Sequence, residues 1–463
     1  MAFIPTDTTI QHLREQVTGS VLTPDDPDYE QARLPWNRST NHYPALILIA
    51  ENAEDVMAGV RFAREAGLGI AIQSTGHGVQ RAANDALLIV TSRMTSIEVD
   101  AEARTARVEA GVIWQQVVDQ AAPHGLAPLL GSSPHVGVMG YTLGGGIGWL
   151  ARRYGLAADS VRSIEIVTPD GVLRHTSPTE NSDLFWGLRG GGGNFGVVTA
   201  MTFDLHPVAT LYGGSLTYPA EMAGAALRFF REWIKTVPDE LTSSIAVIKY
   251  PPLPQLPEAM RGKVEVVVRA AYTGDASEGE ALIQPWLNWQ SPISNTFREL
   301  PFAEVATISN DPVDPVSAHG TNEMLSELSD DVIDIIVRNM RAAESPLLAT
   351  ELRHAGGAIA RVPADANAVG NRDALLYMQM AGMTPTPEAK QAVKSAIRAY
   401  REALRPYVHG GVYLNFTKSG EEDNRAMNAY SSTTYNRLLA LKARYDPDNL
   451  FRFSYPLVQP ESA

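Results

Sequence analysis

The sequence predicts an α+β fold of two domains, in which a glycine-rich domain comes first and a sheet covered by helices follows. Two observations indicate this division. Three glycine-rich tracts fall within the first 200 residues, whereas from about Thr210 glycine becomes sparse and long helical patterns alternate with strands. The length of 463 residues is enough for two or three domains.

The first domain opens with a strand, a helix and a second strand. The apolar run 45–50 predicts a buried strand, and Asn52 is a suitable N-cap for a helix over 54–66. A strand over 69–72 follows, so the three elements form a βαβ unit. The other elements expected here are strands at 86–91, 97–100, 107–110, 161–167, 172–175 and 197–205, and helices at 10–18, 113–124 and 183–188.

The second βαβ strand leads into the loop Gln73-Ser74-Thr75-Gly76-His77-Gly78. Small residues leave successive backbone N–H groups bare, and such groups form a nest for phosphate oxygens. The loop also holds one imidazole, that of His77, between two glycines. On this stretch alone, a strand-end turn with an incidental exposed histidine is the better-supported explanation, and a nucleotide cofactor beside a fixed histidine is the hypothesis that the rest of the chain must support.

Two further tracts, 131–148 and 190–196, are too rich in glycine for regular elements. They read as backbone wrapped closely around a large flat ligand. The pattern Gly191-x-Gly193-x-x-Gly196 matches a dinucleotide fingerprint, but a strand follows it where that motif requires a helix. We therefore reject a Rossmann site.

The second part of the chain predicts a sheet with helices over it. Helices are expected at 220–236, 277–286, 321–341, 386–404 and 432–445, and strands at 243–249, 263–272, 347–354, 374–380 and 411–416. The helix at 321–341 rests on apolar residues at helical spacing, Met324, Leu325, Leu328 and Val332.

Composition excludes several classes of function. The net charge of −14 argues against nucleic acid or an anionic membrane as the main partner. The absence of cysteine excludes disulfides, iron–sulfur clusters and thiol nucleophiles, and the ten histidines are too scattered to predict a metal site. Without a signal-peptide pattern or a membrane-length apolar run, we expect a soluble cytoplasmic protein.

Taken in order, the motifs are far more specific than any one of them. They are the His77 loop, Pro134-x-Val136-Gly137, Leu143-Gly144-Gly145-Gly146-x-Gly148, Asn194-Phe195-Gly196-Val197, Tyr413-x-Asn415 and Tyr445-Asp446-Pro447-x-Asn449. This set resembles the FAD-linked oxidases of the vanillyl-alcohol oxidase (PCMH-type) superfamily, in their berberine-bridge-enzyme-like branch. The resemblance covers nearly the whole chain and is least specific in the middle.

The resemblance implies a PCMH-type FAD-binding domain (1–209), an antiparallel substrate-binding domain (210–405) and a C-terminal segment (406–463) that completes the first. It implies a covalent bond between His77 and the flavin. Many relatives add a cysteinyl bond where this chain has Ser133, so the attachment is expected to be single, as in hydroxynicotine-oxidase-like members. The residues expected to contact FAD are Gln73, Ser74, Thr75, Gly76, His77, Gly78, Ser133, Val136, Gly137, Gly140, Tyr141, Gly145, Gly148, Gly196, Val197, Tyr413, Asn415 and Asn449.

The catalytic base is harder to assign. The two positions where relatives carry a tyrosine for this role are Ile147 and Phe416. The remaining candidates for a base are Glu351, His354, Tyr250, Tyr377 and Tyr413, and Tyr141 is a further catalytic candidate that could line the active site. Glu351 shares a predicted strand face with Arg353 that could equally be a solvated ion pair. Three cofactor-site residues also have purely structural explanations: Tyr141 and Val136 as core packing, and Asn449 as a turn residue.

We therefore predict hydride transfer from a small organic substrate to FAD, with oxygen reoxidising the flavin to give hydrogen peroxide. The substrate class stays open between an amine, an alcohol and a phenolic or allylic carbon. A small Val136 favours an oxidase over a dehydrogenase that uses another acceptor. A biosynthetic oxidative cyclase and a nucleotide-binding protein without turnover also stay open at this point, as does a homodimer.

Overall fold

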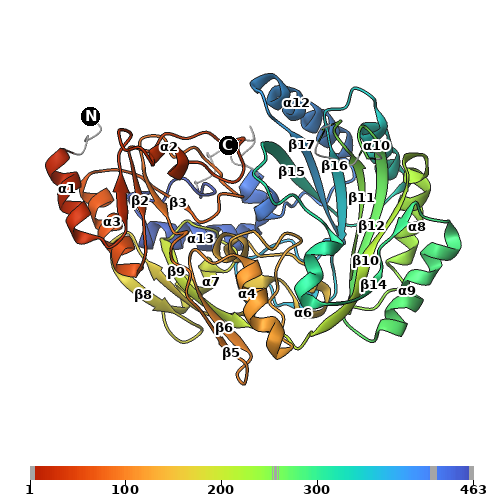
Figure 1. Ribbon diagram of the computed structural model, residues 1–463, viewed down its shortest axis with the longest axis horizontal. Helices are drawn as coiled ribbons and strands as arrows, with labels where there is room; N and C mark the ends of the chain where they lie inside the picture. The colour runs from red at the N-terminus through yellow and green to blue at the C-terminus, as the bar shows by residue number, and fades with distance from the viewer. Residues whose placement is uncertain (1–5, 253, 255–257, 259, 418–424, 458–463) are drawn as a thin grey trace.

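The computed structural model describes residues 6–252, 254, 258, 260–417 and 425–457. It contains three sheets, of four, five and eight strands (Figure 1). The two smaller sheets lie in one half of the molecule, and the large sheet occupies the other half. The α+β class and the antiparallel sheet covered by helices are confirmed by this arrangement and by its match to known folds, given below.

The first sheet has the order β1-β2-β4-β3, in which β2, β4 and β3 are parallel. Its strands are β1 (Ser20–Leu22), β2 (Leu46–Ile49), β3 (Ile70–Gln73) and β4 (Leu87–Val90). The predicted βαβ unit is present as β2, α3 (Ala53–Glu65) and β3, with β4 inserted between its strands. The side chain of Asn52 caps α3 by accepting a hydrogen bond from the Asp55 amide at 2.9 Å. Helix α3 contacts both smaller sheets, so it packs between them.

The second sheet has the order β5-β6-β9-β7-β8 and is antiparallel. Its strands are β5 (Ile97–Asp100), β6 (Thr105–Glu109), β7 (Val161–Val167), β8 (Leu173–Thr176) and β9 (Val197–Asp204). The helical elements around the smaller sheets are α1 (Asp7–Gln16), α2 (Tyr29–Ala32), α4 (Trp114–Ala121), α5 (Val138–Leu143), α6 (Ala151–Tyr154) and α7 (Ser182–Leu188), with 3₁₀ turns η1 (Ala122–His124) and η2 (Ala157–Ser160).

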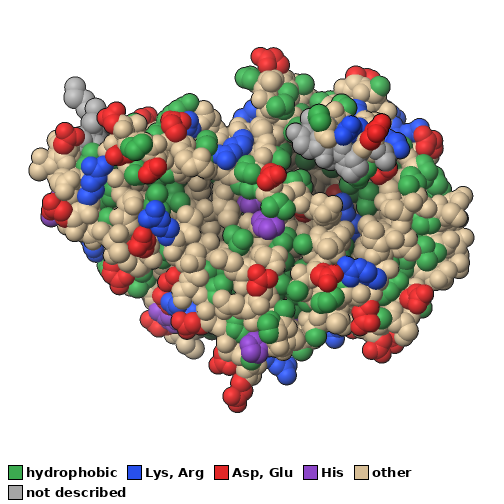
Figure 2. Space-filling model, in the orientation of Figure 1, with side chains coloured by type: hydrophobic (Ala, Val, Ile, Leu, Met, Phe, Trp, Pro, Cys, Tyr) green, Lys and Arg blue, Asp and Glu red, His purple; other side chains and the backbone are tan. Residues whose placement is uncertain are grey.

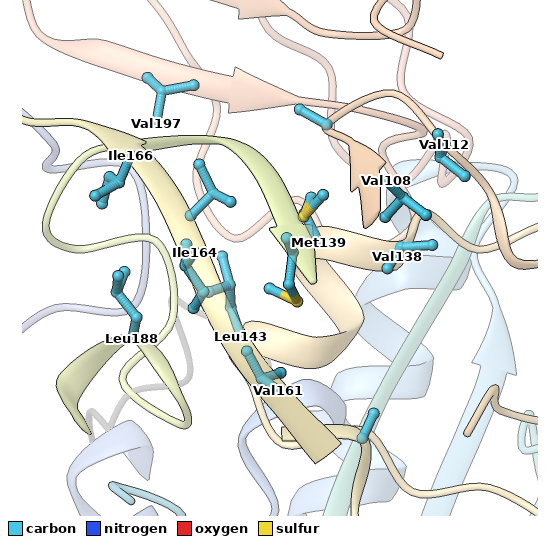
Figure 3. Packing of buried hydrophobic residues seen from close by; sticks show 14 of the residues in the cluster. Val108, Val112, Val138, Met139, Leu143, Val161, Ile164, Ile166, Leu188 and Val197 are labelled. Atoms are coloured by element: carbon cyan, nitrogen blue, oxygen red, sulfur yellow. The ribbon is translucent and has the colours of Figure 1, made fainter. Parts of the chain in front are cut away.

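Helix α5 corrects the expectation that the second glycine tract has no regular structure. Val138, Met139 and Leu143 are all buried and pack against β6 and β7 (Figure 3). An apolar face at helical spacing therefore stabilises one and a half turns between flanking glycines. The opposite side of α5 carries Gly140, which is exposed.

The third sheet has the order β13-β10-β12-β11-β16-β17-β15, with β14 also paired to β10, and every pair is antiparallel. Its strands are β10 (Thr210–Pro219), β11 (Leu241–Lys249), β12 (Val264–Tyr272), β13 (Ser294–Asn295), β14 (Arg298–Pro301), β15 (Ala318–Leu325), β16 (Ala349–His354) and β17 (Leu376–Met383). Strand β10, which lies between β12 on one side and the short strands β13 and β14 on the other, was not predicted.

Helices cover the outer face of the large sheet (Figure 1). They are α8 (Ala223–Trp233), α9 (Ala276–Trp289), α10 (Asp330–Arg341) and α12 (Pro387–Leu404), and η3 (Ala220–Met222), η4 (Phe302–Ile308) and α11 (Ala358–Arg361) are the shorter turns. The predicted helix 321–341 is wrong in its first half, which is strand β15. Met324 and Leu325 point to opposite sides of this strand, into two different apolar clusters. The last two residues of the strand are apolar, one on each side, and together with Leu328 and Val332 beyond the strand they mimicked helical spacing.

The chain ends back at the smaller sheets. It contains η5 (Leu414–Phe416), η6 (Arg425–Ala429) and α13 (Ser432–Tyr445), and α13 packs against α7. The predicted strand 411–416 is absent. The Tyr413 backbone bonds the Asn322 side chain instead of a neighbouring strand, donating to Oδ1 at 2.7 Å and accepting from Nδ2 at 3.1 Å.

Candidate functional site

The loop after β3 is held against an earlier stretch of chain. The amides of Trp36 and Asn37 donate to the carbonyl oxygens of Thr75 and Gly76, at 3.0 and 3.2 Å. Gly76 has φ +79°, and a Cβ there would lie 2.6 Å from Pro35. Glycine is therefore required both by the backbone conformation and by the close approach of the two segments.

The imidazole of His77 has a defined orientation in this loop. Its Nδ1 is 2.8 Å from Thr75 Oγ1, and its ring stacks on Trp36 with centroids 4.1 Å apart and an interplanar angle of 14°. The ring is half-buried. Figure 2 shows histidine side chains at the centre of this face, between the two halves of the molecule.

Two polar atoms beside His77 lack a partner within the part of the chain that the structure describes. They are Gln73 Oε1 and Ser74 Oγ, and both are buried. A Cβ on Gly137, which precedes α5, would approach Ser74 Oγ to 2.8 Å, so the loop and the start of α5 are adjacent. Gly78 and Gly140 border open space, because a Cβ at either would meet no atom within 4 Å. The buried polar atoms and this open space fit a polar ligand lying between the loop and α5.

At the next glycines, Gly145 and Gly148, the missing Cβ makes room for the protein's own atoms. The Gly145 amide donates to Thr142 O at 3.0 Å, and a Cβ on Gly145 would lie 3.1 Å from the Tyr413 ring. A Cβ on Gly148 would overlap the carbonyl oxygen of Leu130. The structure therefore uses the missing Cβ of Gly145 and of Gly148 for packing within the protein.

The space at Gly145 is occupied by the ring of Tyr413. Its hydroxyl oxygen accepts hydrogen bonds from the amides of Gly146 and Ile147, at 2.7 and 3.0 Å, and from Asn415 Nδ2 at 3.1 Å. Asn415 Nδ2 also donates to the Tyr141 carbonyl at 2.8 Å. Burial raises the pKa of Tyr413 to about 12, although these three donors lower it. Tyr413 is therefore a neutral phenol at neutral pH.

The ring of Tyr141 fills the interior. It lies edge-on to Trp114, with centroids 5.6 Å apart, and contacts the positions where Gly131 and Gly146 lack a Cβ. Burial, with a contribution from Tyr413, raises the pKa of its hydroxyl well above 10. The core explanation of the Tyr141 side chain therefore agrees with its position.

Glu351 lies on the face of the large sheet that is turned toward the smaller sheets, opposite its helices. Its carboxylate accepts from Ser244 Oγ at 2.8 Å, Arg269 Nη1 at 3.2 Å and Arg353 Nε at 2.9 Å. Burial alone would raise the pKa of Glu351, but Arg353, Arg269 and the Ser244 hydroxyl together hold it below its usual value. Glu351 is therefore an ionised carboxylate that is held by these three hydrogen bonds, and it is a weak base.

Arg353 joins this face to the glycine-rich half. Its Nη2 donates to Ser132 Oγ at 3.3 Å, and its guanidinium lies 5.1 Å from the centre of the Phe416 ring. The Phe416 ring in turn packs edge-on against Tyr413 at 5.0 Å. Residues from β16, from the 131–148 tract and from the C-terminal segment therefore meet at one place.

Several residues of this face were missed from the sequence. Ser244 and Arg269 are direct cross-strand partners, Gln379 stands opposite Glu351, and Asn322 stands opposite Gln379. The available signal was the alternation of polar with apolar residues in each strand. The sequence did not, however, show which strands are neighbours.

The other predicted catalytic residues differ in how near they lie to this place. Tyr250 is half-buried beyond the end of β11, about 13 Å along the strand from Ala246, the residue opposite Glu351. Burial raises the pKa of the Tyr377 hydroxyl, whose ring is 5.4 Å from that of Tyr413. His354 bonds Arg152, with 2.9 Å between Nε2 and Nη1, and burial lowers its pKa to about 3.

The remaining residues predicted to contact the cofactor differ in how deeply they are buried. Ser133 and Val136 are half-buried near α5, whereas Val197 is fully buried beside Ile166 (Figure 3). Gly196 has φ +156° and would overlap Val167 O if it carried a Cβ, so it packs against β7.

Asn449 is not brought to the His77 loop. It is an exposed turn residue with φ +51°, and the next residue, Leu450, accepts a hydrogen bond from the Ile70 amide at 2.9 Å. Ile70 begins β3, and Gln73 ends it. Asn449 therefore lies at the opposite end of that strand, and its turn explanation agrees with its position.

Among the described residues, no helix is both long and apolar enough to cross a membrane.

Comparison with known proteins identifies the family. Residues 44–177 match the FAD binding domain family, and residues 412–456 match the family described as berberine and berberine like. An FAD-linked oxidoreductase of Dictyostelium discoideum is 30% identical over 95% of this chain and 94% of its own length. (R)-6-hydroxynicotine oxidase of Paenarthrobacter nicotinovorans is 28% identical over 96% and 98%.

The fold is shared with solved structures of the same type. BBE-like 1 of Physcomitrella patens matches with a TM-score of 0.84 at 22% identity, over 97% of this chain and all of that one. With both domain types present and a relative aligned over nearly its whole length, this chain belongs to the berberine-bridge-enzyme-like branch of the PCMH-type FAD-linked oxidases.

Proposed function

We propose that this oxidase holds FAD through one covalent bond to His77 and oxidises a small amine, passing the electrons to oxygen. The observation that carries the cofactor assignment is the loop 73–78. It places an oriented imidazole beside two buried polar atoms, Gln73 Oε1 and Ser74 Oγ, that lack a partner within the described residues. These atoms and the open space at Gly78 and Gly140 fit the polar part of FAD.

Each residue has a defined task in this arrangement. The loop would bind the pyrophosphate, and Thr75 and Trp36 would hold the imidazole of His77 in one orientation. The imidazole of His77 would hold the flavin through one of its ring nitrogens. Bound FAD then supplies hydride acceptance and reoxidation by oxygen. Ser133 cannot form a second tether, because it has no thiol.

The electrostatics of the substrate face support an amine. Glu351 has a depressed pKa and Tyr413 a pKa of about 12. Neither is matched to removing a proton from an alcohol near neutral pH. A neutral amine has a lone pair that assists hydride loss from the adjacent carbon, so it needs no strong base. A relative named for 6-hydroxynicotine oxidation is consistent with this class.

The tether is tested by acid precipitation. The wild-type pellet should stay yellow, and the protein mass should exceed the sequence mass by one FAD. His77→Ala should release its flavin into the supernatant, and Thr75→Val, which loses the 2.8 Å contact to Nδ1, should be flavinylated more slowly. Ser133→Ala is the matched control and should keep the full mass. Flavin that stays attached in His77→Ala would place the tether elsewhere.

The substrate class is tested by anaerobic flavin bleaching with panels of amines, alcohols, sugars and phenols. Rapid bleaching by amines, with peroxide formed when air is admitted, is the expected result. Bleaching only by sugars or alcohols would refute the amine assignment. Reduced flavin that reacts with a dye but not with oxygen would indicate a dehydrogenase, and a cyclised product would indicate an oxidative cyclase.

A further inference from the structure

The face of the large sheet that carries Glu351 has a second acidic residue, Glu265 on β12. Its strand neighbours Val266 and Val268 belong to the apolar cluster between the sheet and its helices. Because side chains alternate along a strand, Glu265 points to the opposite face, as does Arg269, which pairs with Glu351. Glu265 therefore belongs to the face that the substrate is proposed to meet.

Four apolar side chains separate Glu265 from Glu351 on this face. Ile248 and Ala349 are half-buried, so the rest of the chain does not cover them completely. At the usual strand spacing and rise, the Cα atoms of Glu265 and Glu351 are about 12 Å apart. We call the four residues the apolar patch. They are Ile248 and Ala246 of β11, Ala349 of β16 and Val267 of β12, which the strand register places opposite one another or opposite the two glutamates.

The carboxylate of Glu265 is buried without a counter-ion. Glu265 is only 9% exposed, and no residue in the described ranges of the chain forms a hydrogen bond or an ion pair with its carboxylate. Burial raises its pKa, and the charge of Lys263 offsets this only in part. Glu351, by contrast, is paired with Arg269 and Arg353. Buried carboxylates are normally paired, so Glu265 indicates a cation that comes from outside the chain.

The surroundings of Glu265 also favour a cation. Because its two oxygens lack partners yet are not among the fully enclosed polar atoms, solvent reaches them. Tyr250 is close enough that Glu265 contributes, after burial, to raising the pKa of the tyrosine hydroxyl. A protonated nitrogen is attracted both by a carboxylate and by an aromatic ring. The net charge of −14 attracts cations to the molecule as a whole.

From this placement we propose that Glu265 forms a cation subsite, which binds a second, protonated nitrogen at the far end of the amine substrate. The inference rests on the proposed amine oxidation. The substrate is then an elongated diamine: one nitrogen is neutral and undergoes oxidation, the other is an ammonium ion paired with Glu265, and the spacer between them lies on the apolar patch. The four apolar side chains of that patch suit a hydrocarbon spacer, which has no polar group to pair.

The test compares matched pairs of amines as anaerobic reductants of the flavin-loaded protein. Each pair is an α,ω-diamine and a monoamine of the same chain length, and the dissociation constant comes from the concentration dependence of flavin bleaching. Wild type should bind the long diamines at least about 10-fold more tightly, as one charge-assisted hydrogen bond provides. Glu265→Gln, which keeps the shape but not the charge, should lose this preference. Ala349→Leu, which fills the apolar patch, should weaken long diamines more than short ones.

A probe that cannot be oxidised separates this subsite from the proposed activity. Hexyltrimethylammonium has no lone pair on its nitrogen, and its binding is measured by calorimetry. Glu299→Gln, which removes an exposed carboxylate from β14 of the same sheet, is the matched control and should bind the probe as wild type does. Glu265→Gln should bind it at least about 10-fold more weakly.

The two measurements distinguish the two proposals. If no amine bleaches the flavin but Glu265→Gln still weakens binding of the probe, the amine oxidation is wrong and the cation subsite stands. If amines bleach the flavin with no preference for diamines, or if Glu265→Gln binds the probe as tightly as wild type, the cation subsite is wrong.

Discussion

Tyr413→Phe tests whether the glycine tract exists to seat this phenol. The hydroxyl oxygen accepts from the amides of Gly146 and Ile147 and from Asn415 Nδ2. Phenylalanine would leave the two amides buried and unpaired, at about 1–3 kcal/mol each. Asn415 loses less, because its Nδ2 still donates to the Tyr141 carbonyl. We expect a loss of about 3 kcal/mol of stability.

The measurement is amide hydrogen exchange of peptides covering 143–150, together with urea unfolding. Exchange at Gly146 and Ile147 should accelerate strongly in Tyr413→Phe, since both amides lose their acceptor. Tyr377→Phe is the matched control: its ring is 5.4 Å away, but its buried hydroxyl has no partner among the described residues. Equal effects of the two substitutions, or unchanged exchange in Tyr413→Phe, would refute the claim that the Tyr413 hydroxyl bonds the amides of Gly146 and Ile147.

Three further outcomes follow from the same geometry. The side chain of Gly140→Leu projects into open space, so this variant should keep a stable apoprotein but incorporate less FAD. In Gly148→Ala the new Cβ overlaps the carbonyl oxygen of Leu130, so this variant should yield less folded protein. Flavin absorbance and urea unfolding distinguish the two effects. Burial lowers the pKa of His354 from 6.5 to about 3, so as pH falls below 6.5 this residue is protonated in the unfolded chain before it is protonated in the folded one. This residue should therefore lower the free energy of unfolding by about 1.4 kcal/mol per pH unit. His354→Gln should remove its contribution to the slope of unfolding free energy against pH, measured from pH 7 to 4. Glu351→Gln should lower the free energy of unfolding by about 3–5 kcal/mol above pH 4.5, because it leaves two arginines without their carboxylate. The difference from wild type should shrink at acid pH, because wild-type Glu351 is itself protonated as pH falls through its depressed pKa. A difference that does not change with pH would contradict this prediction.

Most elements could be predicted because their signals are local. The bounds expected for β7 and α13 are those observed, and the cap of α3 is the predicted Asn52. The secondary-structure predictions failed where contacts with distant parts of the chain determine the local structure. Strand β15 ends in Met324 and Leu325, which enter two different apolar clusters, and the backbone of Tyr413 bonds the side chain of Asn322 instead of a neighbouring strand.

The site was predictable to the extent that one short segment forms it. The His77 loop is such a segment, and its glycine, threonine and histidine are all explained by contacts within it and with the 35–37 stretch. The substrate face is not local. Glu351 was singled out, but Ser244, Arg269 and Gln379 come from three other strands, and only the sheet order makes them neighbours.

The glycines themselves show what sequence could not separate. In a row of glycines, a missing Cβ can make room for a ligand or for the protein's own atoms. Gly145 and Gly148 are packed against the Tyr413 ring and a backbone carbonyl, whereas Gly78 and Gly140 border open space. The open pair borders the place where we propose that the cofactor binds. Gly145 instead makes room for the C-terminal segment, because a Cβ there would lie 3.1 Å from the Tyr413 ring.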